Sequence, residues 1–291
     1  MKKRVILNKL KIFLFLIILY FISFFKTHDN YCQDDITLIT ALFKIETNRH
    51  NFTNYLDWVN NLLSINRSIV FFIDKNISQL IKNKRPKIFV NKTIWIENDF
   101  KDLYSYKHFK KEFNETYLID GAKYKHTVPL FILWAEKCFF IKKTIYYNYF
   151  RSKCFYWIDA GYFREKNMSS FINNWPSTEK CYSDPRVLIN GVREIGSNEF
   201  KLLKSFDYIA HEKFKNNCNV GAGLFGGQAK YLIRFIYYYY KTIKLFYKKK
   251  KFIGSEQNLY TYISYLHKDI VNLINTKMNY YYFKTYLSKN D

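Results

Sequence analysis

A short apolar run that stops at a carboxylate constrains the fold of this chain more than any other feature. The segment Phe155–Gly161 reads FYWIDAG, so a run of aromatic and aliphatic residues ends at Asp159 and then at a glycine. Such a run is typical of a buried strand. Asp159 is therefore expected in the loop just past the C-terminal end of that strand. Open α/β sheets bind their ligands at this edge, which makes Asp159 a candidate site residue.

Other segments alternate between strand and helix patterns. Strands are expected at Ile36–Phe43, Ser68–Asp74 and Pro86–Val90, and helices at Phe52–Leu63 and Leu130–Tyr149. This alternation predicts an α/β fold, a Rossmann-type mixed and largely parallel sheet flanked by helices. No internal repeat and no Pro/Gly/Ser-rich linker interrupts the chain, so residues 36–291 are expected to form one domain.

The N-terminal residues have the pattern of a membrane anchor. Residues 1–11 are rich in Lys and Arg, residues 12–25 are uninterruptedly apolar, and Lys26 follows. The run is shorter than the roughly 20 residues of a comfortable span, and no small-residue cleavage site follows it. Lysines at both ends can reach the interface, which favours an uncleaved signal-anchor over a cleaved signal. The positive-inside rule then predicts a single-pass type II protein of the Golgi or ER membrane. It would have a cytoplasmic tail (1–11), a transmembrane helix (12–25), a short stem (26–35) and a lumenal domain (36–291).

Sequons and cysteines agree with a lumenal domain. Acceptor sequons for N-glycosylation begin at Asn51, Asn66, Asn76, Asn91, Asn114 and Asn167. The five cysteines permit two disulfides and one leftover thiol in an oxidising compartment. Cys32 lies next to the predicted anchor and is a candidate for an intermolecular bridge, and hence for a homodimer.

The formal net charge of +23 does not indicate a nucleic-acid partner. The 47 Lys and Arg residues are dispersed apart from the N-terminus and Lys248–Lys251, and no nucleic-acid-binding motif accompanies them. The lysine run is expected to be a solvated loop. Its functional alternative is attraction of a nucleotide diphosphate or an anionic lipid headgroup.

Several segments together resemble a known family. They are, in order, Thr37–Phe43, Tyr55–Trp58, Val70–Asp74, Trp134–Lys137, Phe155–Arg164, Gly221–Gly227 and Glu256–Gln257. On these residues, the stretch 36–275 resembles the WlaTC/HtrL (HtrL/YibB-type) family of glycosyltransferase-like proteins, which look like GT-A enzymes. The resemblance implies a GT-A-like fold and transfer of a sugar from a nucleotide-sugar donor. The family's late motif usually reads Asp-Gln, whereas this chain has Glu256 and Gln257.

The resemblance also implies a set of site residues. Asp159 and Glu256 are the expected catalytic residues, and Asp159 is the expected ligand of Mn²⁺ or Mg²⁺, which would neutralise the diphosphate leaving group. The usual GT-A signature has two Asp separated by one residue, but Gly161 stands at the second place here. Further ligands could come from Asp74, Glu256 or His267. Alternatively, Arg164 or lysines could replace the metal by pairing with phosphate. The expected donor- or acceptor-binding residues are Thr40, Asp74, Arg164, Asn219, Gly221, Gly223, Gly226, Gly227 and Gln257.

Two functions therefore remain open from the sequence. The first is a membrane-anchored glycosyltransferase acting on a glycan, glycoprotein or glycolipid. The second is a non-catalytic lumenal or surface protein that retains the fold in order to bind carbohydrate. The single carboxylate of the FYWIDAG motif and the presence of Glu256 keep the second function open.

Overall fold

A mixed sheet forms the centre of the computed structural model, which describes residues 32–45, 50–165, 171, 173, 175–204, 219–276 and 280–288. Within these residues the sheet has seven strands, in the order β3-β2-β1-β4-β6-β5-β7. The strands are β1 (Ile36–Leu42), β2 (Ser68–Asp74), β3 (Thr93–Asn98), β4 (Cys154–Ile158), β5 (Val187–Gly191), β6 (Val220–Gln228) and β7 (Val271–Asn275). Only the pairings of β6 with β4 and with β5 are antiparallel. The predicted α/β fold with a mixed, mostly parallel sheet is confirmed, and it fits a Rossmann-like arrangement.

The strand order reverses between β1 and β4. From β1 the chain adds β2 and β3 on one side, and then returns to add β4 on the other side. The C-terminal ends of β1 and β4 therefore diverge into connections that leave in opposite directions. This topological switch point is where open α/β sheets leave a crevice.

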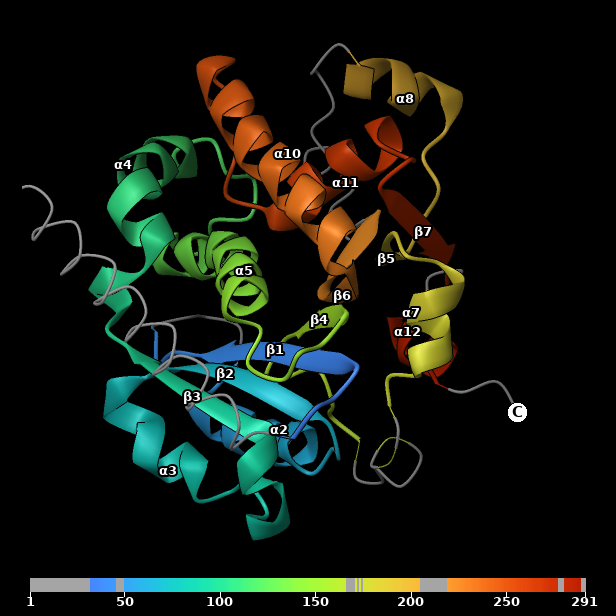
Figure 1. Ribbon diagram of the computed structural model, residues 1–291. Coiled ribbons are helices and arrows are strands. Elements are labelled where there is room, and N and C mark those ends of the chain that lie inside the picture. Colours follow the sequence, from blue (N-terminus) through green and yellow to red (C-terminus); the bar gives the residue numbers. More distant parts are fainter. Residues whose placement is uncertain are drawn as a thin grey trace, which may run out of the picture.

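Helices cover both faces of the sheet (Figure 1). One face carries α4 (Tyr104–Tyr117), α5 (Val128–Tyr147), α10 (Ala229–Lys248) and α11 (Glu256–Leu266). The other face carries α2 (Phe52–Leu63), α3 (Ser78–Lys82), α7 (Thr178–Ser183) and α12 (Tyr280–Tyr286). Successive residues of β1 point to opposite faces, so Leu38 and Ile39 enter two separate cores. Burial on both faces explains the near-continuous apolar strands of the sequence. The remaining described helix of more than one turn is α8 (Ser197–Lys204), beside three 3₁₀ turns, η1 (Lys75–Ile77), η2 (Lys87–Lys92) and η3 (Phe100–Asp102).

Helix α5 is bounded by recognisable signals. The Thr127 hydroxyl accepts a hydrogen bond from the Leu130 amide at 3.4 Å, and Pro129 lies in the first turn. The helix ends where Asn148 adopts a left-handed conformation with φ of 40°. Its Phe131 ring packs so closely on the backbone before α11 that a Cβ at Gly254 would lie 2.6 Å from the ring. The absence of a side chain at residue 254 therefore sets the approach of α11 to α5.

One local prediction was wrong. The segment Pro86–Val90 is not a strand, because most of it forms the turn η2, which is closed by hydrogen bonds from the Phe89 amide to the Pro86 carbonyl and from the Thr93 hydroxyl to the Phe89 carbonyl. The third strand of the chain starts later, as β3, and pairs with β2. The glycine cluster Gly221–Gly227, expected to bind the donor or acceptor, belongs to the extended strand β6, and no glycine among the described residues has a positive φ.

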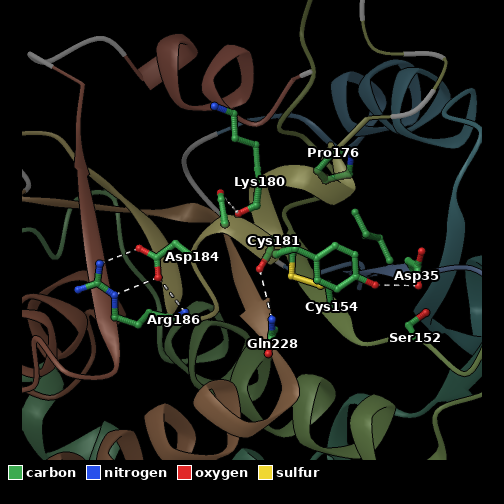
Figure 2. Close-up of a disulfide and its surroundings, with 12 residues drawn as sticks. Asp35, Ser152, Cys154, Pro176, Lys180, Cys181, Asp184, Arg186 and Gln228 are labelled. Carbon is green, nitrogen blue, oxygen red and sulfur yellow. Dashed lines mark hydrogen bonds and ion pairs between the residues drawn. A yellow bond between two sulfur atoms is a disulfide. The ribbon is translucent and has the colours of Figure 1, made fainter. Parts of the chain in front are cut away.

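A disulfide joins Cys154 at the start of β4 to Cys181 in α7 (Figure 2). Next to it the Tyr182 hydroxyl donates to Asp35 at 2.9 Å, and Gln228 donates to the Cys181 carbonyl at 3.5 Å. Of the other cysteines described, Cys32 is an exposed thiol and Cys138 a buried one. Cys218 lies outside the described residues, so the second predicted disulfide stays a prediction.

The predicted anchor, residues 12–25, also lies outside the described residues, as does Asn167. Among the helices of the part that is described, none has both the length and the apolar character that a bilayer span requires. The type II topology thus remains a prediction.

Candidate functional site

A cavity of about 510 Å³ opens at the switch point between β1 and β4. Its floor is formed by residues that end β1, by Asp159 and Gly161 after β4, and by Gly221 and Gly223 at the start of β6. Because β6 runs antiparallel to β4, its first residues lie at the same edge as the last residues of β4. Side chains of α5 and the first residues of α11 close one side. The cavity therefore lies where the sheet topology predicts a ligand.

Asp159 is held at this edge by three hydrogen bonds. Its amide donates to the Gly223 carbonyl at 2.8 Å. Its Oδ1 accepts from the indole Nε1 of Trp157 at 2.7 Å and lies 2.9 Å from the Nζ of Lys137. No described residue donates to Oδ2, and the side chain is 41% exposed. The carboxylate is thus oriented through one oxygen and presents the other to the cavity.

Lys137 connects the two carboxylates of the site. Its Nζ lies 2.9 Å from Oδ1 of Asp159 and 3.1 Å from Oε1 of Glu256, and it donates to the Ala222 carbonyl at 3.2 Å. These three acceptors match the three N–H groups of an ammonium. Burial opposes the charged form, but the charges of Asp159 and Glu256 and the hydrogen bonds to them outweigh it, so the pKa of Lys137 is raised above its ordinary value of 10.5. Lys137 is therefore an almost fully buried side chain that is charged at neutral pH.

Glu256 is the first residue of α11 and is buried behind Lys137. Burial raises the pKa of its carboxyl, the charge of Asp159 adds to this, and the charge of Lys137 opposes it. The sequence predicts Glu256 as a catalytic residue and a possible metal ligand. In the structure it is an acidic residue in the first turn of a helix, where a negative charge is favourable. Its role in chemistry stays a prediction.

An aromatic cluster flanks the cavity next to Arg164. The rings of His50, Tyr55 and Trp58 contact one another edge-on, and the Arg164 guanidinium lies 4.3 Å from the Trp58 ring centroid. The Arg164 Nε donates to the Gly161 carbonyl at 3.0 Å. A Cβ at residue 161 would lie 2.8 Å from Trp58 and 2.9 Å from Tyr55. The glycine after Asp159 is therefore required by these two rings.

The structure brings six of the predicted site residues to the cavity: Asp159, Arg164, Gly221, Gly223, Glu256 and Gln257. It does not bring the other five into it. Thr40 is buried in β1, and Asp74 ends β2, where it accepts from the Asn76 amide at 2.9 Å and caps η1. Asn219 is buried just before β6. Gly226 and Gly227 pair with Tyr156 and Phe155 along β4, so they lie farther along β6 than the glycines of the cavity.

The lining residues that were missed include Lys137, Trp157 and Asn190. Asn190 lies in β5, and its Oδ1 accepts from the Thr276 hydroxyl at 2.7 Å. A signal for Lys137 was present, because an acid and a base stand side by side in the apolar run of α5. Glu136, its neighbour, accepts from the amides of Tyr104 and Ser105 at the start of α4 instead.

The residues present do not fit a metal ion held by protein ligands alone. Among the residues described, no three or more His, Cys, Asp or Glu side chains are grouped to coordinate one. Asp159 and Glu256 are bridged by Lys137, Asp74 lies outside the cavity, and the His267 ring stacks on Tyr238 at 3.7 Å. In this cavity the predicted Mn²⁺ or Mg²⁺ would find Oδ2 of Asp159, to which no described residue donates.

The chain matches no protein-family model, and none of the curated proteins matches it.

Proposed function

We propose that this protein is a membrane-anchored glycosyltransferase with a GT-A-like fold, which transfers a sugar from a nucleotide-sugar donor to a glycan, glycoprotein or glycolipid. The observation that supports it is the position of Asp159. This carboxylate follows β4 at the switch point and opens into the cavity beside the Arg164 guanidinium. Proteins of this topology hold nucleotides at such a crevice.

The cavity has the size and lining of a small-molecule site. Its volume of about 510 Å³ lies within the range of roughly 300–1,000 Å³ that is usual for ligand pockets. Phe52 and Tyr55 offer ring faces and edges for a base or a sugar. Arg164 offers a planar cation for phosphate oxygens, which it can pair through two parallel hydrogen bonds. The combination of polar and apolar groups in the lining would orient such a donor.

In this proposal Asp159 acts as a general base. The acceptor hydroxyl would approach Oδ2, and its oxygen would form a bond to the anomeric carbon of the donor. The hydroxyl proton passes to Oδ2, and the bond between the anomeric carbon and the diphosphate oxygen breaks with its electron pair leaving on the diphosphate. Positioned bases of this kind contribute about 10²–10⁴-fold in rate. The hydrogen bonds from Trp157 and Lys137 to Oδ1 hold the carboxylate in one orientation for this step.

The cellular setting is part of the proposal. Residues 12–25 would anchor the chain in the Golgi or ER membrane with the domain in the lumen. The sequon asparagines Asn51, Asn76, Asn91 and Asn114 are exposed on the domain, as lumenal glycosylation requires. Cys32 is exposed close to the start of β1, which suits an intermolecular disulfide between two copies.

A panel of nucleotide sugars tests the transferase. The full-length chain in detergent would be incubated with UDP-, GDP- and CMP-sugars, and both binding and nucleotide release would be measured. We expect one class of donor to bind and to be slowly hydrolysed or transferred, and the Asp159→Asn variant to lose turnover. Asp102→Asn is the matched control, because Asp102 is an exposed carboxylate paired with Lys107 outside the cavity. Absence of binding for every donor, with or without Mn²⁺, would overturn the proposal.

The non-catalytic alternative is supported by one observation. Both carboxylates that could carry chemistry are bridged by the same lysine, as in a structural ion-pair network. A folded protein that binds free glycans on an array but binds no nucleotide sugar would favour this alternative.

A further inference from the structure

We propose that Lys137 stands in for the divalent cation at this site, so that the protein binds and uses its donor without a metal ion. The part of this inference that concerns the donor rests on the proposed function. The part that concerns the metal applies to the free protein and can be tested separately.

The position of the Lys137 ammonium group is the first observation that supports this proposal. In a metal-dependent site, a cation would draw together the carboxylates that face the diphosphate. Here the Nζ of Lys137 lies within 2.9 Å of Asp159 and 3.1 Å of Glu256. These carboxylates come from the loop after β4 and from the start of α11, and the lysine comes from α5. One buried nitrogen, carried by α5, therefore already draws together the acidic groups that two other elements bring to the cavity.

Asp159 also has only one carboxylate oxygen left to coordinate a metal ion. Its Oδ1 accepts from Trp157 and faces Lys137, which leaves Oδ2 as the open oxygen. A divalent ion on Oδ2 would also lie close to a fixed positive charge in a partly buried site, where like charges repel strongly. One oxygen and an adjacent cation make a poor metal site.

The packing around Gly161 leaves no space for a second carboxylate. The two-carboxylate signature of metal-dependent GT-A enzymes would need an acidic side chain at residue 161. A Cβ there would lie 2.8 Å from the Trp58 ring and 2.9 Å from the Tyr55 ring. The aromatic cluster that carries Arg164 thus excludes the second carboxylate. The same cluster places the Arg164 guanidinium, 4.3 Å from the Trp58 ring centroid, at the wall of the cavity.

These contacts give the two cations of the site, Lys137 and Arg164, different roles. Lys137 is a positioning residue, because its three N–H groups are directed at Asp159, Glu256 and the Ala222 carbonyl. It offsets the negative charge that would otherwise repel a diphosphate. Arg164, whose terminal nitrogens have no acceptor among the described residues, pairs with the phosphate oxygens and stabilises the charge that develops on the leaving group.

A Mn²⁺ titration of the full-length protein tests the metal part directly. Binding would be followed by the loss of the electron paramagnetic resonance signal of free Mn²⁺ in the wild type, Lys137→Ala, Lys137→Arg and Lys142→Ala. We expect no saturable site in the wild type, in Lys137→Arg, or in Lys142→Ala, an exposed lysine of the same helix. Lys137→Ala frees two neighbouring carboxylates and is expected to gain a saturable Mn²⁺ site, which the other three proteins lack. If Lys137→Ala does not fold, the presence or absence of saturable Mn²⁺ binding to the wild type tests the inference alone. Saturable Mn²⁺ binding to the wild type that Asp159→Asn removes would overturn the inference.

Donor binding in chelator tests the second part. Isothermal titration with the nucleotide sugar selected by the panel would be run in EDTA and in Mn²⁺. We expect dissociation constants and turnover in EDTA to remain within about twofold of the values in Mn²⁺, and Arg164→Gln to weaken binding in both. Binding or turnover that EDTA abolishes and Mn²⁺ restores would overturn the inference and leave the transferase intact. Absence of binding in both media overturns the transferase, and the Mn²⁺ titration then still decides the metal part.

Discussion

The Nζ of Lys137 and the Oδ1 of Asp159 lie 2.9 Å apart, but the two side chains differ in exposure, at 4% for the lysine and 41% for the aspartate. The ion pair is therefore buried on its positive side and open on its negative side. Replacement of Asp159 should therefore have a different effect from replacement of Lys137. A change at Asp159 acts on what the cavity can do, whereas a change at Lys137 acts on stability as well.

Asp159→Asn is expected to reduce kcat by about 100-fold or more and to leave the fold intact. The amide keeps the shape of the carboxylate but cannot take up the acceptor proton. Lys137 keeps Glu256 and the Ala222 carbonyl as partners, so the melting temperature should change little. Kinetics with the best donor, together with a thermal melt, measure both effects. Unaltered turnover would exclude Asp159 as the base.

Two glycines of β6 should respond differently to the same substitution. A Cβ at Gly223 would lie 3.2 Å from Oδ2 of Asp159 and from the Tyr162 ring, at the cavity. Gly223→Val should therefore lower activity and donor affinity more than stability. A Cβ at Gly226 would lie 2.3 Å from the Phe155 carbonyl oxygen and 2.4 Å from the Tyr156 ring. Gly226→Val should lower the free energy of unfolding by about 3 kcal/mol or more, because backbone must move.

Urea unfolding and donor titration of both variants separate these effects. Loss of folding in Gly223→Val would mean that this glycine is only structural. A folded Gly223→Val with normal affinity and turnover would remove the start of β6 from the site.

The stabilising effect of Lys137 should disappear at high pH. Because its pKa in the folded protein is raised above 10.5, its stabilising effect is complete below that pH and is lost as the pH rises through the folded-state pKa. Lys137→Met should therefore be less stable than the wild type by about 3 kcal/mol at neutral pH. This difference in the free energy of unfolding, called the stability gap below, should narrow above pH 10.5.

Chemical denaturation across the neutral and alkaline range measures this gap. Lys142→Met is the control, because Lys142 is exposed on the same helix and should show no gap at any pH. A gap for Lys137→Met that stays constant into strong alkali would contradict the assignment of a charged lysine.

The Cys154–Cys181 disulfide should stabilise the domain without affecting the site. It closes a loop with a sequence separation of 27 residues, for which chain entropy gives about 3–4 kcal/mol. Cys181→Ser is therefore expected to lower the melting temperature clearly, and donor affinity measured well below the melting temperature should be unchanged. The wild type in reducing agent should behave in the same way. Equal melting temperatures with and without reductant would show that the bond contributes nothing.

Lumenal topology predicts N-glycans on the exposed sequons. The chain produced in a eukaryotic secretory pathway should shift to lower mass on treatment with peptide-N-glycosidase F. Removal of Asn51, Asn76, Asn91 and Asn114 should abolish most of the shift, because these side chains are exposed, whereas Asn66 is partly buried. Protease treatment of sealed microsomes should spare the domain. Digestion of the domain from the cytosolic side, without any glycan, would contradict the type II topology.

The sequence predicted those parts of the fold that depend on local pattern. The strands ending at Leu42, Asp74 and Ile158 and the helix α5 follow from apolar runs and their boundaries. Strand β6 could not be recognised, because its four glycines favour a turn when only neighbours in the chain are considered. In the sheet, the ring of Tyr156 packs against the backbone of Gly226, where a Cβ would lie only 2.4 Å from it, so the glycine belongs in this strand.

The site was predictable only in part for a related reason. Asp159 follows from the end of its own strand. The place of Lys137 depends on β6 running antiparallel beside β4 and on α11 returning to α5, which are contacts between distant segments. The same long-range pairing explains why Gly223 lies in the cavity while Gly226 does not.

The contact between Phe131 and Gly254 sets the spacing between α5, which carries Lys137, and α11, which carries Glu256. This spacing therefore depends on both residues together. A Cβ at residue 254 would meet the ring at 2.6 Å, so growth of one side chain requires shrinkage of the other. Either change made singly would alter the separation of α5 and α11, and with it the distance between Lys137 and Glu256. In a library that randomises residues 131 and 254 together, functional members should therefore recur as compensating large and small pairs. The same contact that positions the charges would then be visible as covariation.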